Sequence, residues 1–152
     1  IPEFKLLLVG PDHLNGLLAE EAYDLPIGSV IFTGWRSDVC QLLRSADITL
    51  ASSTSEGLGL NIIEAMACGL PVVAYDNRGH REIISDRING RLIPLNDCSE
   101  LAKAVAELRI SPEKVKRFTQ NASESITRFD TDNVLRELYE ILESSEYSAT
   151  DC

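Results

Sequence analysis

The chain has 152 residues, of which 44% are hydrophobic and 25% are charged, and its formal net charge is -10. This length and apolar content suffice for one packed core, so we expect a single domain over residues 1–152. The negative charge argues against nucleic acid or an anionic membrane as a partner, because both attract basic surfaces. No apolar run is long enough to cross a membrane, and the four scattered cysteines indicate free thiols in a cytoplasmic protein.

Short apolar runs alternate with helical patterns through the first two thirds of the chain. The runs predict strands at 4–10, 30–33, 47–51, 72–75 and 91–94, the first of them buried on both faces. The intervening patterns predict helices at 14–23, at 38–45, from about Leu60, and around 81–85. Strands that alternate with helices favour an α/β fold of Rossmann-like, three-layer α/β/α type with a mostly parallel sheet. Such sheets bind ligands beyond the carboxyl ends of their strands.

The last third of the chain, from Asn96, has helical periodicity only. Three sets of apolar residues each share a helix face: Leu101, Val105 and Leu108; Val115, Phe118, Ala122 and Ile126; Val134, Leu135, Leu138 and Leu142. Pro112 suits the first turn of the second helix. The run Asp130-Thr131-Asp132 resembles a metal-binding Asp-x-Asp motif, but its place before a helix favours capping. We expect the polar end from Ser144 to be frayed.

The stretch from Ser55 to Ala74 combines a loop, a helix and a strand around two carboxylates. Glu56 precedes the glycines at 57 and 59, and Glu64 lies four residues into a helix that begins near Leu60. Free amides in the first turn of a helix favour an anion, and glycines let a phosphate approach the backbone. This arrangement suits a nucleotide-sugar site, although a simple strand-to-helix loop with solvated glutamates would have the same spacing.

The same stretch resembles the Glu-x7-Glu signature of the retaining group 1 glycosyltransferases, glycosyltransferase family 4. The likeness extends from about Phe4 to Leu108 and includes the Asn89-Gly90 pair and a Leu-Ile-Pro run at 92–94. It implies half of a GT-B fold, the half that binds the donor. The family's Gly-Arg strand and the Lys after it are not found in this chain. We therefore expect a fragment truncated at the amino terminus, without its first strand–helix unit and acceptor domain, and nearly inert alone.

The resemblance also implies roles for the residues of the central stretch. Glu56 would contact the donor sugar close to the reacting carbon, where a carboxylate favours oxocarbenium character. Glu64 would hold the ribose diol. The backbone amides would bind the diphosphate without a metal or cofactor, and they belong to Gly57, Leu58, Gly59, Leu60 and Asn61.

Other positions are less specific. The resemblance implies that Thr33, Gly34 and Trp35 lie at the nucleobase, and Trp35 suits base stacking and core packing equally well. The turn at Gly10-Pro11-Asp12 lacks the family's second glycine, so we expect a structural role. His80 would suit a general base, but nothing in the sequence pairs with it, and we expect a surface histidine.

These features predict an enzyme that transfers a hexose from a UDP- or GDP-linked donor to a glycan, lipid or other acceptor. Its acceptor would bind through the missing amino-terminal domain, and the full-length enzyme would act in the cytoplasm or at the inner membrane face. One alternative is a sugar-nucleotide epimerase of similar fold, against which the complete Glu-x7-Glu run argues. The other is a non-catalytic nucleotide-sugar-binding module.

Overall fold

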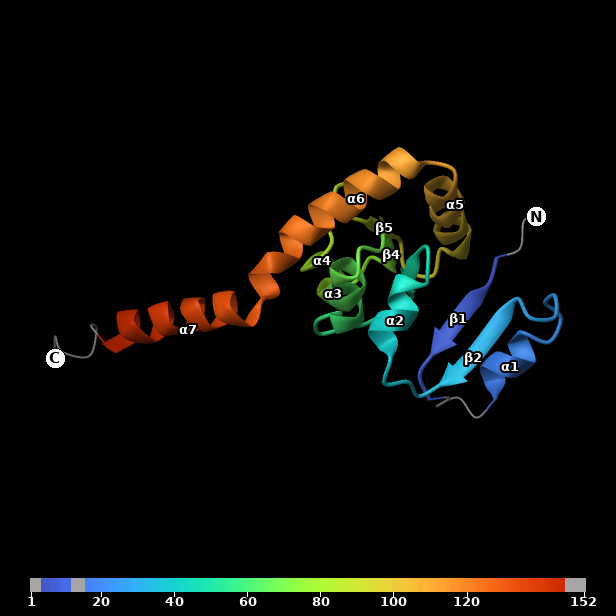
Figure 1. Ribbon diagram of the computed structural model, residues 1–152, viewed down its shortest axis with the longest axis horizontal. Coiled ribbons are helices and arrows are strands. Elements are labelled where there is room, and N and C mark those ends of the chain that lie inside the picture. The colour runs from blue at the N-terminus through green and yellow to red at the C-terminus, as the bar shows by residue number, and fades with distance from the viewer. Residues whose placement is uncertain (1–3, 12–15, 147–152) are drawn as a thin grey trace. The chain divides into compact units, whose positions relative to one another are not determined.

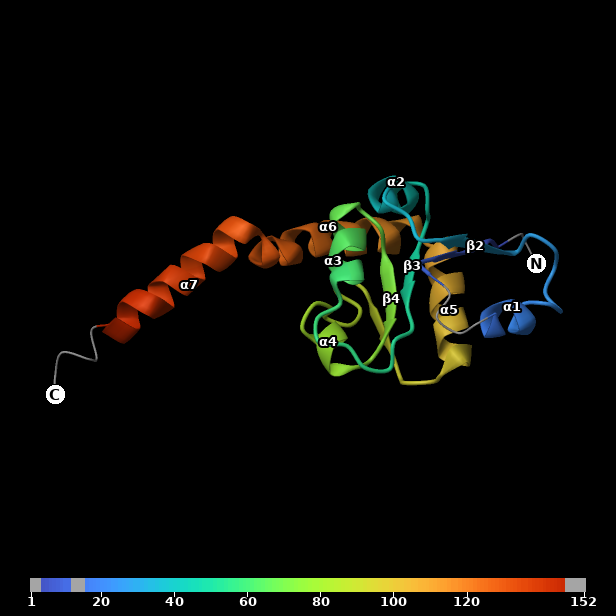
Figure 2. The ribbon, with the colours of Figure 1, turned by 90° about the horizontal axis from the view of Figure 1, so that it is seen from below.

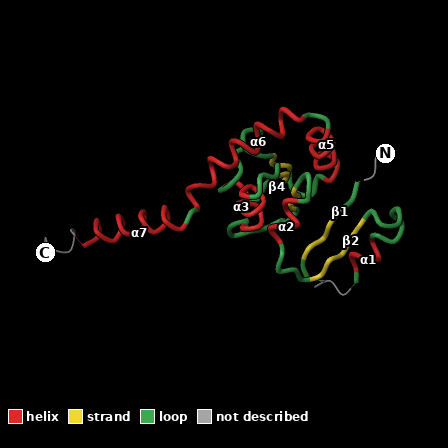
Figure 3. Tube along the Cα trace, viewed as in Figure 1, coloured by secondary structure: helices red, strands yellow, loops and turns green. Residues whose placement is uncertain are grey.

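The computed structural model describes residues 4–11 and 16–146, and the chain divides into two compact units, 1–39 and 40–152. In the first unit, β1 (Leu6–Val9) and β2 (Val30–Gly34) pair in parallel, with Leu6 opposite Val30. Figure 3 shows the two strands side by side. The short helix α1 (Leu17–Glu21) connects them. The first two residues of the helix predicted at 14–23 lie outside the described residues.

The first strand is less buried than its apolar run predicts. Leu6 is 41% exposed and Val9 is 43% exposed, so the prediction of a strand buried on both faces is wrong. Within the described residues β1 has only β2 as a hydrogen-bonded neighbour. A two-stranded sheet with one short helix cannot cover both faces of its strands.

The second unit contains a parallel sheet in which β4 (Val72–Tyr75) lies between β3 (Thr49–Ala51) and β5 (Arg91–Ile93). Successive side chains of a strand point to opposite faces. Accordingly, Val72 and Ala74 belong to one hydrophobic cluster, while Val73 and Tyr75 belong to another. Since both faces of β4 are buried, its sequence is continuously apolar.

Helices cover both faces of this sheet. The cluster on one face includes Ile62 and Met66 of α3 (Leu60–Ala67), and Leu43 of α2 (Val39–Arg44) packs against it. The cluster on the other face includes Ala104 and Leu108 of α5 (Cys98–Arg109). Figure 2 shows β4 between α3 and α5. The helix α6 (Pro112–Ser125) contributes to both clusters and begins with its proline, as predicted. The second unit is therefore a three-layer α/β/α structure of Rossmann type, which confirms the predicted fold class.

The carboxyl-terminal helix α7 (Thr131–Glu146) follows the short 3-10 helix η1 (Ile126–Phe129). Figure 1 shows α7 projecting from the end of α6. Its apolar residues are 44–62% exposed: Val134, Leu135, Leu138, Ile141 and Leu142. The helix extends to Glu146, and the end that the sequence predicts to be frayed lies mostly outside the described residues.

The Asp130-Thr131-Asp132 run caps α7. The carboxylate of Asp130 accepts a hydrogen bond from the backbone N–H of Asp132 at 3.3 Å, and its carbonyl accepts from Val134 N–H at 3.0 Å. This is the capping role that the sequence predicts. Within residues 4–11 and 16–146, no three His, Cys, Asp or Glu side chains gather as a metal site would require.

One helix lies three residues earlier than predicted. The structure has α4 at Arg78–Arg81, whereas the sequence pattern predicts a helix around 81–85. The side chain of Asn77 accepts a hydrogen bond from the backbone N–H of His80 at 2.9 Å and so caps the helix at its start. This capping bond, rather than the apolar pattern of the next residues, fixes where the turn begins.

A buried arginine links β5 to α5. The Arg91 side chain lies 2.9 Å from Glu107, 3.3 Å from Asp86 and 3.7 Å from Glu100. Lys114 also donates to Glu107. That hydrogen bond lowers the pKa of Glu107, and attraction by Lys114 and Arg91 acts in the same direction.

No helix of the described ranges is long and apolar enough to cross a bilayer.

Candidate functional site

The loop between β3 and α3 presents unpaired backbone donors at the carboxyl end of the sheet. Gly59 is the N-cap of α3, and no side chain caps this end. In the described part of the chain, no acceptor is bonded to the backbone N–H groups of Gly57, Leu58, Gly59 or Asn61. Free N–H groups at the start of a helix bind anions, and the helix dipole favours negative charge there. The predicted helix start and four of its five predicted amides are therefore present. The prediction is wrong for Leu60, whose N–H donates to the carbonyl of Leu58 at 2.9 Å and is not free for a ligand.

The two carboxylates of the central stretch are available to a ligand. Glu56 is half-buried in the loop, and Glu64 is exposed on α3. Neither forms an ion pair within the ranges that the structure describes. Because the nearby N–H groups are also unpaired, the loop and the helix offer both hydrogen-bond donors and acceptors without first breaking internal bonds.

The turn that contains α4 packs against this loop. The amide nitrogen of Asn77 donates to the carbonyl of Ser53 at 2.8 Å. A Cβ atom on Gly79 would lie only 2.5 Å from the carbonyl oxygen of Glu56, so the two backbones are in close contact. The ring of His80 lies against Gly59, where Cδ2 would be 3.3 Å from a Cβ atom. The turn therefore touches the loop at its beginning, at Glu56 and at its end.

His80 is fully buried, at 0% exposure, so the prediction of a surface histidine is wrong. Its Nδ1 atom lies 2.6 Å from the carbonyl oxygen of Tyr75. The sequence raised His80 only as a general base, and it did not predict that His80, Asn77 and Gly79 pack against the loop. Asn is a preferred N-cap residue, and this signal at Asn77 would have placed the turn at the correct position. No local pattern indicates that the turn packs under the loop.

The residues predicted at the nucleobase belong to the first unit. Thr33 Oγ1 lies 3.3 Å from the carbonyl of Leu8 and 3.0 Å from that of Gly34, which adopts a φ of 65°. Trp35 is 74% exposed, so its core-packing alternative is wrong. A hollow of about 400 Å³ is lined by Trp35, Arg36, Ser37 and Asp38. An exposed indole beside a hollow is suited to stacking on a planar ligand.

The turn predicted at residues 10–12 is described only in part. Gly10 has a φ of 136°, which suits the predicted structural turn, while Asp12 lies outside the described residues.

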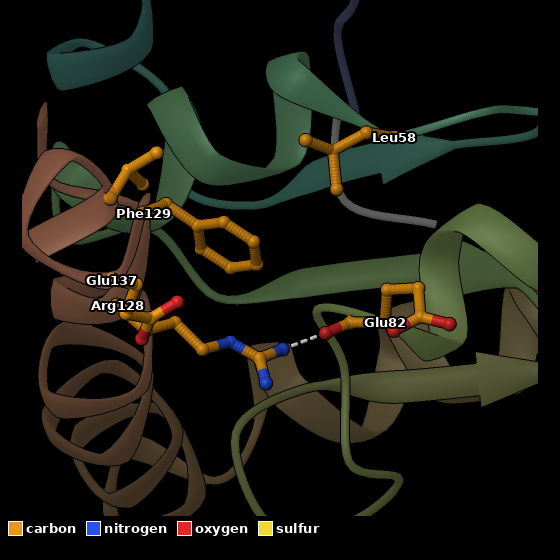
Figure 4. A pocket seen from close by; sticks show the side chains of 6 residues that line it. Leu58, Glu82, Arg128, Phe129 and Glu137 are labelled. Carbon is orange, nitrogen blue, oxygen red and sulfur yellow. Dashed lines mark hydrogen bonds between the residues drawn. The ribbon is translucent and has the colours of Figure 1, made fainter. Parts of the chain in front are cut away.

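In the second unit, a hollow of about 460 Å³ is lined by Leu58, Glu82, Arg128, Phe129, Val134 and Glu137. Figure 4 shows Arg128 reaching across it to donate a hydrogen bond to the carbonyl of Glu82. The hollow therefore lies between the loop that precedes α3 and the start of α7.

The fold and the loop define a Rossmann-type protein in which a helix starts with unpaired N–H groups at the carboxyl end of the sheet. The family model "Glycosyl transferases group 1" matches residues 1–125. The chain therefore belongs to the group 1 glycosyltransferases. It is 37% identical over 147 residues to EpsD of Bacillus subtilis (strain 168), covering 93% of this chain and 37% of EpsD. It is 31% identical over 146 residues to phosphatidyl-myo-inositol mannosyltransferase of Mycolicibacterium smegmatis, covering 94% of this chain and 37% of that protein.

Solved structures of the same architecture include complexes with nucleotides. Anabaena Alr3699/HepE in complex with UDP-glucose superposes with a TM-score of 0.85 at 29% identity, and its complex with UDP gives 0.87 at 30% identity. Each comparison covers 95% of this chain and 42% of HepE. The chain thus has the fold of GT-B glycosyltransferases and spans about two fifths of the length of these relatives.

Proposed function

We propose that this chain is the donor-binding half of a retaining glycosyltransferase of family 4. The whole enzyme moves a hexose from a nucleoside diphosphate sugar to a glycan, lipid or other acceptor. The observation that carries the proposal is the set of unpaired N–H groups at the start of α3, bracketed by the free carboxylates of Glu56 and Glu64. The bound UDP and UDP-glucose of HepE favour a uridine-linked donor.

The amides of the loop bind the donor diphosphate. Gly57, Leu58 and Asn61 are exposed, so their N–H groups can reach phosphate oxygens. Hydrogen bonds to a charged acceptor contribute roughly 1.5–3 kcal/mol each. They also stabilise the negative charge that builds up on the leaving nucleoside diphosphate. Leaving-group stabilisation by amides fits a metal-independent mechanism.

The two glutamates divide the recognition of the donor. Glu64, exposed on α3, accepts hydrogen bonds from the ribose hydroxyls. Glu56, half-buried in the loop, lies at the sugar, where its negative charge stabilises the oxocarbenium character of the transition state. Retention of the anomeric configuration then requires the acceptor hydroxyl to attack from the face that the diphosphate leaves.

The nucleobase binds at the segment from Thr33 to Trp35. The exposed Trp35 indole offers a stacking face, and the backbone around Gly34 offers hydrogen-bonding groups. The acceptor binds through a domain that the relatives contain and that this chain does not cover. Membership of the group 1 glycosyltransferases weighs against the alternative of a sugar-nucleotide epimerase. If the protein were instead a non-catalytic binding module, the whole protein would turn over no donor.

The test is calorimetric titration of this chain with UDP, UDP-glucose and GDP, each with and without EDTA. UDP and UDP-glucose should bind, EDTA should leave the affinity unchanged, and Glu64→Ala should weaken binding about 10- to 100-fold, the equivalent of 1.5–3 kcal/mol. Glu124→Ala removes the same charge from an exposed position on α6 and serves as the matched control. The proposal fails if no nucleotide binds at millimolar concentration, or if the control weakens binding as much as Glu64→Ala.

A further inference from the structure

The buried imidazole of His80 has one nitrogen with a partner and one without. A carbonyl oxygen only accepts hydrogen bonds, so Nδ1 must donate to the carbonyl of Tyr75 across 2.6 Å. The Asn77 amide nitrogen, 3.1 Å from the same Nδ1, then faces a second donor and cannot bond to it. That amide instead donates to Ser53. In a neutral ring with its proton on Nδ1, the Nε2 atom is a pure acceptor.

This Nε2 atom is buried and has no hydrogen-bond partner within the described residues. Leaving a buried acceptor unpaired is costly, so an orphan of this kind calls for an explanation. The ring contacts the loop at Gly59: Cδ2, which is bonded to Nε2, lies 3.3 Å from the position of a Gly59 Cβ atom. Gly59 is itself buried, and its backbone N–H lacks an acceptor in the same part of the chain.

We propose that His80 is a positioning residue for the donor-binding loop: its Nε2 accepts the backbone N–H of Gly59 when the donor diphosphate is bound. This inference rests on the proposed function. The edge of the ring next to Nε2 lies beside the buried Gly59, and neither Nε2 nor the Gly59 N–H has a partner among the described residues. A shift of the loop that brings the two atoms within hydrogen-bond distance satisfies both. The hydrogen bond then fixes the end of the loop, while the exposed amides of Gly57, Leu58 and Asn61 remain directed to the phosphates.

The same geometry separates this role from catalysis by the imidazole. His80 is 0% exposed, so it does not reach the donor sugar or an acceptor hydroxyl. Its neighbour Gly79 packs against the backbone of Glu56, and Asn77 holds Ser53. The α4 turn thus holds the other parts of the loop by packing at Glu56 and by the hydrogen bond from the Asn77 side chain to Ser53. The proposed hydrogen bond from Gly59 to Nε2 holds the end of the loop next to α3.

Two substitutions of His80 test the roles of Nδ1 and Nε2 separately. Asn at position 80 places an amide near Nδ1, which keeps the bond to Tyr75 and removes the acceptor at Nε2. Gln reaches one bond further and places an amide oxygen near Nε2. In titrations of this chain with UDP, His80→Asn should weaken binding roughly tenfold, the loss of one hydrogen bond, while His80→Gln should bind close to wild type. Equal affinities for the two variants, whether both retained or both reduced, would overturn the acceptor role.

A spectroscopic measurement on the unaltered ring keeps the inference testable if both variants fail to fold. Long-range proton–nitrogen NMR of the wild-type chain should show the Nδ1-protonated tautomer of His80. Saturation with UDP should move its Nε2 resonance upfield, as expected when that atom accepts a hydrogen bond. The chain has two histidines, so His13→Gln assigns the signals.

An Nε2 resonance that does not move when UDP saturates the chain would refute the inference. If UDP binds, Glu64→Ala weakens it and neither His80 variant does, this inference falls and the proposed function stands. If the wild-type chain does not bind UDP, both fall.

Discussion

The contact between Gly79 and the Glu56 backbone makes Gly79→Ala a sharp test of how the loop is held. A Cβ at position 79 would lie 2.5 Å from the carbonyl oxygen of Glu56, 2.9 Å from its carbonyl carbon and 3.0 Å from its Cβ. Ordinary van der Waals contact begins at 3.4 Å. The carbonyl of Glu56 must therefore retreat by about 0.9 Å, the difference between 3.4 and 2.5 Å.

The effect on stability should be small and the effect on function large. Overpacking costs about 1–3 kcal/mol, but alanine is favoured over glycine within a helix by about 1 kcal/mol, which offsets part of this cost. In contrast, a displacement of about 1 Å at a reacting group lowers the rate by about 10²-fold. We expect the variant to fold, to lose about 0–2 kcal/mol of stability and to lose about 10²-fold in turnover. It should also bind UDP-glucose more weakly, because the N–H of Gly57 belongs to the same peptide unit as the displaced carbonyl and moves with it.

The assay is a pair of measurements on the same protein: urea unfolding and calorimetric titration with UDP-glucose, followed by turnover of the intact enzyme. Gly90→Ala is the matched control, because its Cβ would lie 3.1 Å from the carbonyl of Val72, away from the loop. The control should lose stability and keep its donor affinity. If Gly79→Ala bound UDP-glucose as the wild type does, the loop would not depend on the α4 turn, and the argument would be refuted.

Three further outcomes follow from other groups. In the intact enzyme Glu56→Gln should lower kcat by about 10²-fold or more with little change in KM, and a normal kcat would exclude a role in the transition state. The pKa of Glu107 is lowered from its ordinary 4.5 by the hydrogen bond from Lys114, so this group stabilises the fold above pH 4.5 and loses that effect as the pH falls through its folded-state pKa. The urea midpoint should drop over this interval in the wild type, and Glu107→Gln should flatten the drop. The Sγ atoms of Cys40 and Cys68 lie 3.6 Å apart, so diamide, which accepts the two thiol hydrogens, should join them in a disulfide; peptide mapping that finds both thiols free would contradict this.

Local patterns predicted the central strand and the helix after the loop well. The predicted strand 72–75 has the same bounds as β4, because an unbroken apolar run between a Leu-Pro turn and Asp76 leaves little choice of boundary. The helix predicted from Leu60 begins there, after Gly59. The unpaired amides of Gly59 and Asn61 were also predictable, since an uncapped helix start has them, whereas those of Gly57 and Leu58 lie before the helix.

The support of the loop was not predictable in the same way. The bond from Asn77 to Ser53 joins residues 24 positions apart, and the burial of His80 depends on packing against Gly59. No periodicity reports contacts of this range. The exposure of β1 has a similar cause, because an apolar run gives the preference of a strand for burial but not the number of neighbours that cover it.

The exposed apolar face of α7 determines which part of the second unit unfolds first. Among the described residues, this 16-residue helix contributes nothing to either core cluster, whereas α3 and α5 are each anchored in one. A helix of this length is marginal in water without such packing. Deuterium should therefore replace the amide protons of α7 first, and heating should melt this helix before the sheet. A chain that ends at Asp130 should then unfold in a single sharper transition.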